Sequence, residues 1–229
     1  PNMKNIVTPS QGIHLVVDKK FFPGSNAMMI PKTDDGRVLF AVPWHNKVVI
    51  GTTDTQVDTI SENPKPLREE IDFVLHHANR YLAADISETD VTSMFAGLRP
   101  LVKKGTGKTS LLSRDHTIIV SPSGLVTITG GKWTTYRKMA EDVINNAAFV
   151  AKLPKKDCIT KNFAIQSPPM FYRNENLQQG FSDYSKEMIA WFINHEMAMT
   201  AEDILARRTR LLFLDAKQAI EKAAQVIAD

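Results

Sequence analysis

The segment covering residues 125–139 constrains the fold more than any other part of the sequence. Its first five residues, 125–129, are apolar or β-branched, as in a β-strand. Gly130 and Gly131 then interrupt the strand, and helical character begins near Thr134. The pattern therefore predicts a strand, a tight turn and a helix in immediate succession.

The turn in this segment has the composition of an anion-binding site. The first N–H groups of a helix have no partner inside the helix, and the helix dipole places positive charge at the same end. Glycines let a ligand approach the backbone closely, and Lys132 adds a cation beside them. An ordinary tight turn, with Thr134 as a helix cap, explains the same residues equally well. The spacing alone leaves both interpretations open.

Composition limits the classes of protein to which the chain can belong. A length of 229 residues with 43% hydrophobic side chains suits one large or two small domains. The net charge of +3 is too small to indicate a nucleic-acid partner. Cys158 is the only cysteine, so an internal disulfide is excluded and we expect a reducing compartment. No apolar run approaches the ~20 residues of a membrane span.

The first residues of the sequence do not have the pattern of a signal peptide. Residues 1–4 lack the apolar core of a signal peptide, and they do not begin with methionine. We therefore expect an excised part of a longer protein.

The first 60 residues are predicted to be rich in β-structure. Short apolar runs alternate with turn residues, and Asp35-Gly36 between two such runs is typical of a hairpin. The last three strands are expected to form an antiparallel meander. The predicted strands cover residues 13–17, 27–30, 38–42 and 47–52.

A helix, a further strand and a second hairpin are predicted next. Apolar residues at helical spacing predict a helix over 66–84, with Pro66 in its first turn. The next strand covers 91–96 and is expected to end at the turn 97–100. The second hairpin joins 117–120 to 125–129, and the helix after the two glycines is expected to reach about Val150.

The last third of the chain predicts a linker and then a helical domain. Residues 151–180 are irregular and rich in proline, whereas helices are expected over 184–198, after Thr200 and over 216–228. Thr200 and Asp203 form a variant of the capping box. We therefore predict an α+β fold. Residues 1–150 form an antiparallel or mixed sheet with flanking helices, and residues 181–229 form a small all-α domain.

Two arginines lie at predicted strand ends. Arg99 follows one strand and Arg114 precedes another, and arginines in such positions can converge on a phosphate or carboxylate with bidentate geometry. Solvent exposure, or a local pair such as Arg114 with Asp115, is the commoner fate of a single arginine.

Histidines offer a second kind of chemistry. His14 interrupts a strand and could act as a general base near neutral pH, or it could be a hydrogen-bonded core residue. His76 and His77 are expected on the surface, or partly packed, in the helix over 66–84. No histidine, cysteine or acidic grouping has the spacing of metal ligands, so we predict no metal.

Three observations weigh against a P-loop, a membrane-binding site and a complete dinucleotide-binding module. The run 105–109, Gly-Thr-Gly-Lys-Thr, fails as a P-loop because Val102 stands where the first glycine is required. The basic cluster Arg207, Arg208 and Arg210 is more typical of a solvated helix face than of a membrane site. No G-x-G-x-x-G follows a strand, so a complete dinucleotide-binding module is absent from the sequence.

Seven short motifs occur along the chain in a fixed order. They are Ser10-Gln-Gly-Ile-His14, Pro43-Trp44, Ile50-Gly-Thr-Thr-Asp54, Gly97-Leu-Arg-Pro-Leu101, Ser113-Arg-Asp115, Gly130-Gly-Lys-Trp-Thr-Thr-Tyr-Arg137 and Glu202-Asp-Ile-Leu-Ala-Arg-Arg-Thr-Arg-Leu211. Each motif is weak alone, but seven in register over nearly the whole chain are specific. Together they resemble the FAD-dependent, quinone-linked ("aerobic") glycerol-3-phosphate dehydrogenases.

The resemblance implies an activity and a cofactor. The family oxidises sn-glycerol 3-phosphate to dihydroxyacetone phosphate by hydride transfer to FAD, and electrons pass to quinone at the membrane surface. The family's FAD fingerprint lies in an amino-terminal part that this sequence lacks. The chain is thus similar to the carboxy-terminal portion, with the substrate-binding sheet and the last strand and helix of the FAD domain. We expect it to bind FAD weakly or not at all by itself. We expect the full-length protein to be cytoplasmic and to bind the membrane surface peripherally. It is also a candidate homo-oligomer.

The resemblance also implies roles for particular residues. Arg99 and Arg114 match substrate-binding arginines, and Lys132 matches a lysine beside flavin and substrate. His14 matches a histidine that could take the hydroxyl proton. Departures from the family pattern are small: Trp133 and His116 stand where leucine and tyrosine are expected. The residues expected near the flavin ring are Gly130, Gly131, Lys132, Trp133, Thr134 and Thr135.

Two other hypotheses remain. One is a related FAD oxidase that passes electrons to oxygen. The other is a non-catalytic module whose helical tail binds a partner or a membrane through Arg207, Arg208 and Arg210.

Overall fold

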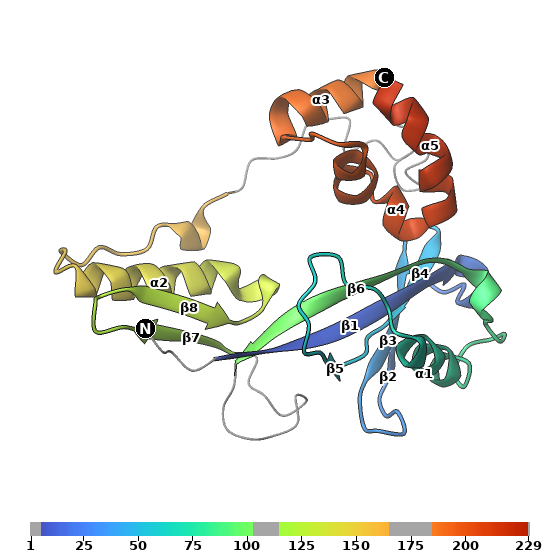
Figure 1. Cartoon of the computed structure of the whole chain (residues 1–229), viewed down its shortest axis with the longest axis horizontal. Coiled ribbons are helices and arrows are strands. Elements are labelled where there is room, and N and C mark those ends of the chain that lie inside the picture. The colour runs from blue at the N-terminus through green and yellow to red at the C-terminus, as the bar shows by residue number, and fades with distance from the viewer. Residues whose placement is uncertain (1–5, 103–114, 165–184, 229) are drawn as a thin grey trace. The chain divides into compact units, whose positions relative to one another are not determined.

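The computed structural model describes residues 6–102, 115–164 and 185–228 (Figure 1). These residues belong to two compact units. The first unit comprises residues 1–10, 54–60 and 98–167, and the second comprises residues 11–53, 61–97 and 168–229. Two long strands, β1 (Val7–Asp18) and β6 (Val91–Val102), contribute residues to both units. Arg114 and the run 105–109 lie outside the described residues.

A six-stranded sheet contains β1 and its neighbours. The strand order is β2-β3-β4-β1-β5, and β6 also pairs with β1. β2, β3, β4 and β1 pair in antiparallel fashion, and Ile30 opposite Leu39 closes the hairpin around Gly36. The predicted hairpin and meander are therefore confirmed. The strands not yet bounded are β2 (Met28–Ile30), β3 (Leu39–Trp44), β4 (Lys47–Gly51) and β5 (Thr55–Gln56).

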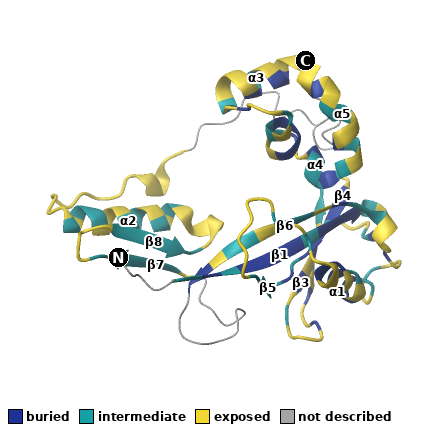
Figure 2. Ribbon diagram, in the orientation of Figure 1, coloured by how far each residue is buried: buried dark blue, intermediate teal, exposed yellow. Residues whose placement is uncertain are grey.

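The main core lies between this sheet and helix α1 (Arg68–Ala78). Successive side chains of a strand point to opposite faces, so alternate residues of β1 reach the same core. Ile13, Leu15 and Val17 are fully buried there, together with Val74 of α1 (Figure 2). Burial of each such side chain contributes about 1.5–3 kcal/mol. The apolar pattern of the sequence thus positions α1 over the sheet.

Helix α1 is shorter than the predicted helix over 66–84. Asn79 ends it, because the Asn79 amide donates to the Ile86 carbonyl at 3.0 Å and accepts from the Ile86 N–H at 2.8 Å. These bonds draw the chain away from the helix axis. The hydrophobic residues after Asn79 pack against the core from a turn instead.

Strand β6 is longer than predicted. The sequence places its end at Gly97, but the strand continues through Arg99 and Pro100 to Val102. Among the described strands β6 pairs only with β1, and a border strand tolerates a proline because one of its edges makes no ladder bonds. Arg99 therefore lies inside a strand and not after one.

The first unit contains a second, two-stranded sheet. β7 (His116–Val120) pairs antiparallel with β8 (Val126–Gly130), which confirms the predicted hairpin. Helix α2 (Tyr136–Val150) packs on β8. A 3-10 turn over Trp133–Thr135 precedes α2, so the helix begins two residues later than predicted. Residues 151–164 are irregular apart from a 3-10 turn at Thr160–Asn162.

The carboxy-terminal helices have a small core of their own. They are α3 (Lys186–Glu196), a π-helical segment (Asp203–Arg208), α4 (Leu211–Leu214) and α5 (Ala216–Ala228). Ile189, Phe192 and Leu211 are buried among them. The predicted capping box is confirmed, since the Asp203 N–H donates to Thr200 Oγ1 at 3.1 Å and the Thr200 N–H donates to Asp203 Oδ2 at 3.0 Å. The sequence did not predict α4.

None of the helices in the described part of the chain is long and apolar enough to cross a membrane.

Candidate functional site

The strand–turn–helix segment has the predicted form. β8 ends at Gly130, and both Gly130 (φ +77°) and Gly131 (φ +84°) occupy the left-handed region that favours glycine. A Cβ on Gly130 would stand 2.8 Å from Val102 Cγ2 and 2.9 Å from the Asp115 carbonyl oxygen. The space beside the glycine is therefore filled by the protein's own atoms.

Lys132 stands at the entrance to α2. Its backbone is extended, and its carbonyl accepts a hydrogen bond from the Thr135 N–H at 3.0 Å and one from Thr135 Oγ1 at 3.0 Å. Lys132, Trp133 and Thr134 are all exposed, and the Trp133 side chain reaches 88% exposure while it stacks on Tyr136. An exposed cation and an exposed indole thus flank the positive end of a 15-residue helix.

The other cations at this end of α2 are neutralised. Arg137 Nη1 lies 2.8 Å from Glu141 Oε2, and Lys138 Nζ lies 2.7 Å from Asp142 Oδ1. The hydrogen bond from Lys138 holds the pKa of Asp142 below its usual range. Within the described residues no carboxylate pairs with Lys132, so its charge is available to an anion from outside the chain.

Arg99 belongs to the same unit as Lys132. It lies three residues before Val102, whose side chain contacts Gly130, and its own side chain is partly buried. β6 thus joins Arg99, through three residues, to the strand end that lies beside Gly130. Arg114, the other predicted substrate ligand, lies outside the described residues.

His14 lies in the second unit, on β1, and is held on two sides. It is paired with Gly51 of β4, where a Cβ would fall 2.6 Å from His14 Cδ2. Phe95 of β6 stacks on the imidazole at 5.2 Å between ring centroids and an interplanar angle of 22°. Glycine at position 51 is thus needed to make room for the ring. The sequence motifs include His14 and Gly51, but no motif indicated a role for Phe95.

A buried carboxylate organises the backbone beside His14. Glu70 of α1 is only 2% exposed and accepts from Thr53 Oγ1 at 2.6 Å, from Gln11 Nε2 at 2.7 Å and from the Leu67 N–H at 3.1 Å. Thr53 Oγ1 in turn accepts from the Ile13 N–H at 3.1 Å. Sequence reasoning missed Glu70, although glutamate at the third position of a helix is the signal of a capping box.

A cluster of ligand-type side chains forms outside these elements. Asp34, His76 and His77 place one ligand atom each within 4.8 Å of one another, a grouping that linear spacing did not reveal. His77 is buried, contrary to the surface or partly packed position predicted for it. Its Nδ1 lies 2.8 Å from the Phe73 carbonyl, and its Nε2 accepts from the Asp34 N–H at 3.1 Å.

Arg80 closes this cluster. It donates to both carboxylate oxygens of Asp34 at 2.7 and 3.1 Å, and its Nη2 lies 2.9 Å from His76 Nε2. These bonds hold the pKa of Asp34 below its usual range. The atoms that would bind a cation are therefore already engaged by a guanidinium and a backbone N–H.

The arginines of the carboxy-terminal helices are also engaged. Arg207 pairs with Glu202 at 2.8 Å and with Asp203 at 3.0 Å, and Arg208 lies 3.3 Å from Glu196 Oε2. These internal ion pairs weaken the hypothesis that the cluster with Arg210 binds an acidic surface.

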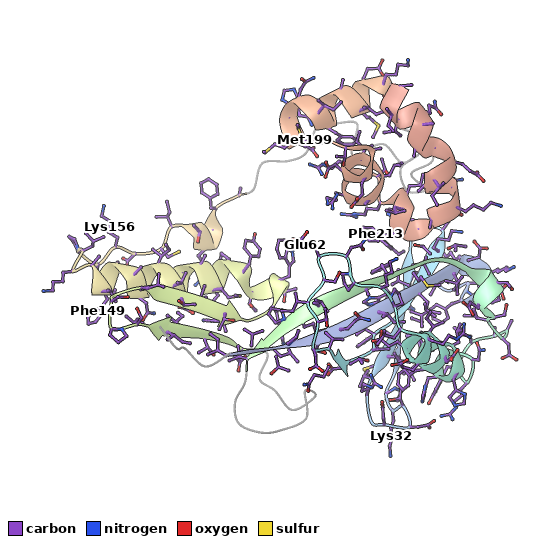
Figure 3. The ribbon with its side chains drawn as sticks, viewed as in Figure 1. Lys32, Glu62, Phe149, Lys156, Met199 and Phe213 are labelled. Carbon is purple, nitrogen blue, oxygen red and sulfur yellow. The ribbon has the colours of Figure 1, made fainter. Side chains whose placement is uncertain are left out.

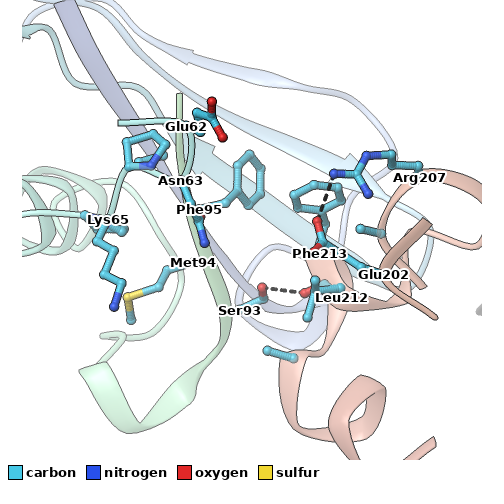
Figure 4. A pocket seen from close by; sticks show the side chains of 15 residues that line it. Glu62, Asn63, Lys65, Ser93, Met94, Phe95, Glu202, Arg207, Leu212 and Phe213 are labelled. Atoms are coloured by element: carbon cyan, nitrogen blue, oxygen red, sulfur yellow. Dashed lines mark hydrogen bonds and ion pairs between the residues drawn. The ribbon is translucent and has the colours of Figure 1, made fainter. Parts of the chain in front are cut away.

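Among the described residues, two cavities bear on the predicted site residues. One, of about 650 Å³, lies in the second unit and is lined by residues such as Lys65, Phe95, Arg207 and Phe213 (Figure 4). The other, of about 640 Å³, is an apolar hollow at the carboxy-terminal end of α2, where Phe149 and Lys156 project (Figure 3). The second lies at the opposite end of α2 from Lys132 and carries none of the predicted site residues.

Comparison with known families agrees with this arrangement. The family described as FAD dependent oxidoreductase matches residues 1–137, and the family described as the C-terminal domain of alpha-glycerophosphate oxidase matches residues 134–229. The chain therefore belongs to the FAD-dependent oxidoreductases.

Individual relatives narrow the likeness to one kind of enzyme. The chain is 42% identical to the mitochondrial glycerol-3-phosphate dehydrogenase of Arabidopsis thaliana over 71% of this chain and 26% of that protein. Identity to the mitochondrial glycerol-3-phosphate dehydrogenase of Homo sapiens is 33%, over 97% of this chain and 37% of that protein. The resemblance drawn from the motifs is confirmed. The chain spans less than half the length of these relatives.

A solved structure supports the same comparison. The crystal structure of the glycerol-3-phosphate dehydrogenase from Bacillus halodurans complexed with FAD matches with a TM-score of 0.72 and 26% identity. The match covers 96% of this chain and 51% of that one. The predicted α+β fold with a helical end is confirmed by this likeness.

The residues present fit one part of FAD. The exposed Lys132 and Trp133 at the positive end of α2 suit an electron-rich ring system that becomes anionic on reduction. The G-x-G-x-x-G pattern that would cradle the pyrophosphate does not occur in the 229 residues. The fit therefore concerns the flavin-ring end of the cofactor alone.

Proposed function

We propose that this chain forms the substrate side of a flavoenzyme that oxidises sn-glycerol 3-phosphate to dihydroxyacetone phosphate. The observation that carries the proposal is the exposed Lys132 at the amino-terminal end of α2, with its neighbouring cations neutralised by Glu141 and Asp142. The names of the relatives supply the substrate. A glycerophosphate dianion requires cations of this kind.

The proposed binding residues combine charge with geometry. Arg99 and Arg114 would bind the phosphate through bidentate hydrogen bonds, which a guanidinium offers to two phosphate oxygens at once. Lys132 would lie between the substrate and the flavin ring, where its ammonium also balances negative charge. Trp133, Thr134 and Thr135 would form the protein surface against that ring, together with the backbone at Gly130 and Gly131.

FAD, when bound, would accept the hydride that leaves C2 of the substrate. The chain's own part in that event is to hold the substrate and to take a proton. His14 is the proposed acceptor of the hydroxyl proton, since an imidazole can accept a proton near neutral pH. Gly51 and Phe95 fix its ring plane, so the proton-accepting nitrogen keeps one direction.

The electron acceptor is proposed to be quinone at a membrane surface, as in the quinone-linked enzymes that the motifs resemble. Oxygen is the second candidate, and the match of residues 134–229 to a domain of alpha-glycerophosphate oxidase favours it. If quinone is the acceptor, we propose that the full-length protein binds a membrane surface peripherally, in the cytoplasm or in mitochondria. The oxygen-linked alternative does not require a membrane.

One experiment tests both the substrate and the acceptor. The full-length flavoprotein is titrated anaerobically with glycerol 3-phosphate while the absorbance of its oxidised flavin is recorded. We expect bleaching by glycerol 3-phosphate and none by glycerol, because the cations select the phosphate. Reoxidation by a soluble quinone without peroxide supports the dehydrogenase, whereas rapid reoxidation by oxygen with peroxide supports the oxidase. A flavin that glycerol 3-phosphate leaves oxidised would contradict the proposal.

A further inference from the structure

We propose that the carboxy-terminal helices position His14 through two stacked aromatic side chains, with Phe213 as the positioning residue. This inference rests on the proposed function, because it assumes that His14 accepts the substrate proton. It goes further, since it gives the helical end of the chain a part in the reaction.

The contacts form a continuous series within the second unit. Phe95 of β6 stacks on His14 at 5.2 Å, and Phe213 of α4 meets Phe95 edge to face at 5.0 Å with an interplanar angle of 69°. Gly51 leaves room for the imidazole, because a Cβ there would stand 2.6 Å from His14 Cδ2. An offset stack followed by an edge-to-face contact is the preferred geometry of aromatic rings. Movement of Phe95 would therefore change the support of His14.

The backbone on either side of Phe213 is fixed to β6. Ser93 Oγ donates to the Leu212 carbonyl at 2.8 Å (Figure 4). Thr92 Oγ1 donates to the Leu214 carbonyl at 2.8 Å. Because helix α4 has only four residues, these two bonds hold much of it in register with β6. Phe213 lies between the two anchored carbonyls, so its ring is presented to Phe95 in one position.

The cavity of about 650 Å³ explains why a restraint is needed. Phe95 and Phe213 both line it (Figure 4), so Phe95 has open space on one side. An aromatic side chain beside a cavity can change rotamer unless a neighbour holds it. Phe213 provides that contact.

The test uses the full-length flavoprotein with Phe213→Leu, which keeps an apolar side chain but removes the aromatic edge. Phe213→Tyr retains the ring and serves as the conservative variant. Phe192→Leu is the matched control, because Phe192 is buried in the core of the carboxy-terminal helices, a cluster that contains neither Phe213 nor Phe95. It reports what a general loosening of the helices does.

Two readouts separate positioning from stability. In the first, ¹³C-labelled histidine is observed by NMR. We expect the His14 ring signal to move in Phe213→Leu, because the Phe95 ring current over it changes, and to stay in place in Phe192→Leu. In the second, we expect Phe213→Leu to lower kcat about 2- to 10-fold with KM changed less than about 2-fold, as loss of one aromatic contact allows. Phe213→Tyr should restore both readouts.

The outcomes are distinct from those of the proposed function. An unchanged His14 signal and an unchanged kcat in Phe213→Leu, with a parent enzyme that oxidises glycerol 3-phosphate, would overturn the inference. Equal effects in Phe192→Leu would overturn it as well. A parent enzyme without that activity contradicts the proposed function, and the NMR comparison then still decides whether Phe213 positions His14. If Phe213→Leu loses its flavin, Phe213→Met is measured by the same two criteria.

Discussion

At the scale of single residues, backbone conformation and packing within the chain explain why positions 130 and 131 are Gly130 and Gly131. Their positive φ angles require glycine, and Val102, Asp115 and Met139 fill the space that side chains would need. The sequence indicated an anion site and an ordinary tight turn with equal weight. In the structure the glycines are required by their backbone conformation. The group in this turn that can attract an anion is therefore the side chain of Lys132, which follows Gly131.

Substitution of Gly130 measures this constraint. Gly130→Ala should lower the free energy of unfolding by about 1–3 kcal/mol, because it forces a side chain into the left-handed region and against Val102. Gly97→Ala is the control, since a Cβ there meets nothing within 4 Å and its φ is ordinary. The control should change stability by less than about 1 kcal/mol. Equal urea midpoints for the two variants would refute the explanation.

At the scale of elements, the sequence predicted what is local. Both hairpins were predictable because alternating side chains and glycine turns lie within a few residues of each other. The extension of β6 through Pro100 was not, because a border position in a sheet depends on strands far away in sequence. Helix α4 was missed for a similar reason, as four residues are too few to show a helical period.

The candidate site also contains residues that a local motif predicts and contacts that only the folded chain creates. Lys132 was predictable from a local motif, and its exposure agrees with that reading. The stack of Phe95 on His14 joins residues 81 positions apart, the difference between 95 and 14, so no local pattern could announce it. Glu70 links α1 to Gln11, 59 positions away, and to Thr53, 17 positions away, and only the folded chain brings these partners together.

Glu70 is expected to be the side chain that ties α1 to the sheet most strongly. Glu70→Ala leaves the donors of Gln11, Thr53 and Leu67 without this acceptor. At about 1 kcal/mol for each, the free energy of unfolding should fall by about 3 kcal/mol. Glu69→Ala, at the exposed neighbouring position, should cost less than about 0.5 kcal/mol. Thermal and urea unfolding of both variants supplies the comparison, and a similar loss in Glu69→Ala would count against the role of Glu70.

At the scale of the whole molecule, helix α2 carries several exposed apolar side chains. Tyr136, Ile144 and Phe149 are each more than half exposed on that helix, as is Trp133 before it. Exposed apolar surface favours association with further protein surface. Self-association of the chain stays a prediction.

The residues with proposed roles belong to different units of the chain: His14 to the second, and Arg99 and Lys132 to the first. We propose above all that the ammonium of Lys132 binds an anionic group of the substrate or the flavin.

Kinetics of Lys132→Met with glycerol 3-phosphate, in the full-length flavoprotein, test that claim most directly. Loss of one charge-assisted contact, worth about 1.5–3 kcal/mol, should lower kcat/KM about 10- to 100-fold. Lys138→Met removes an equal charge six residues further along the chain, from a lysine that is already paired with Asp142, and it should change kcat/KM less than about 2-fold. The account predicts a large loss in the first variant and almost none in the second. Parental kcat/KM in Lys132→Met, or equal losses in both variants, would contradict it.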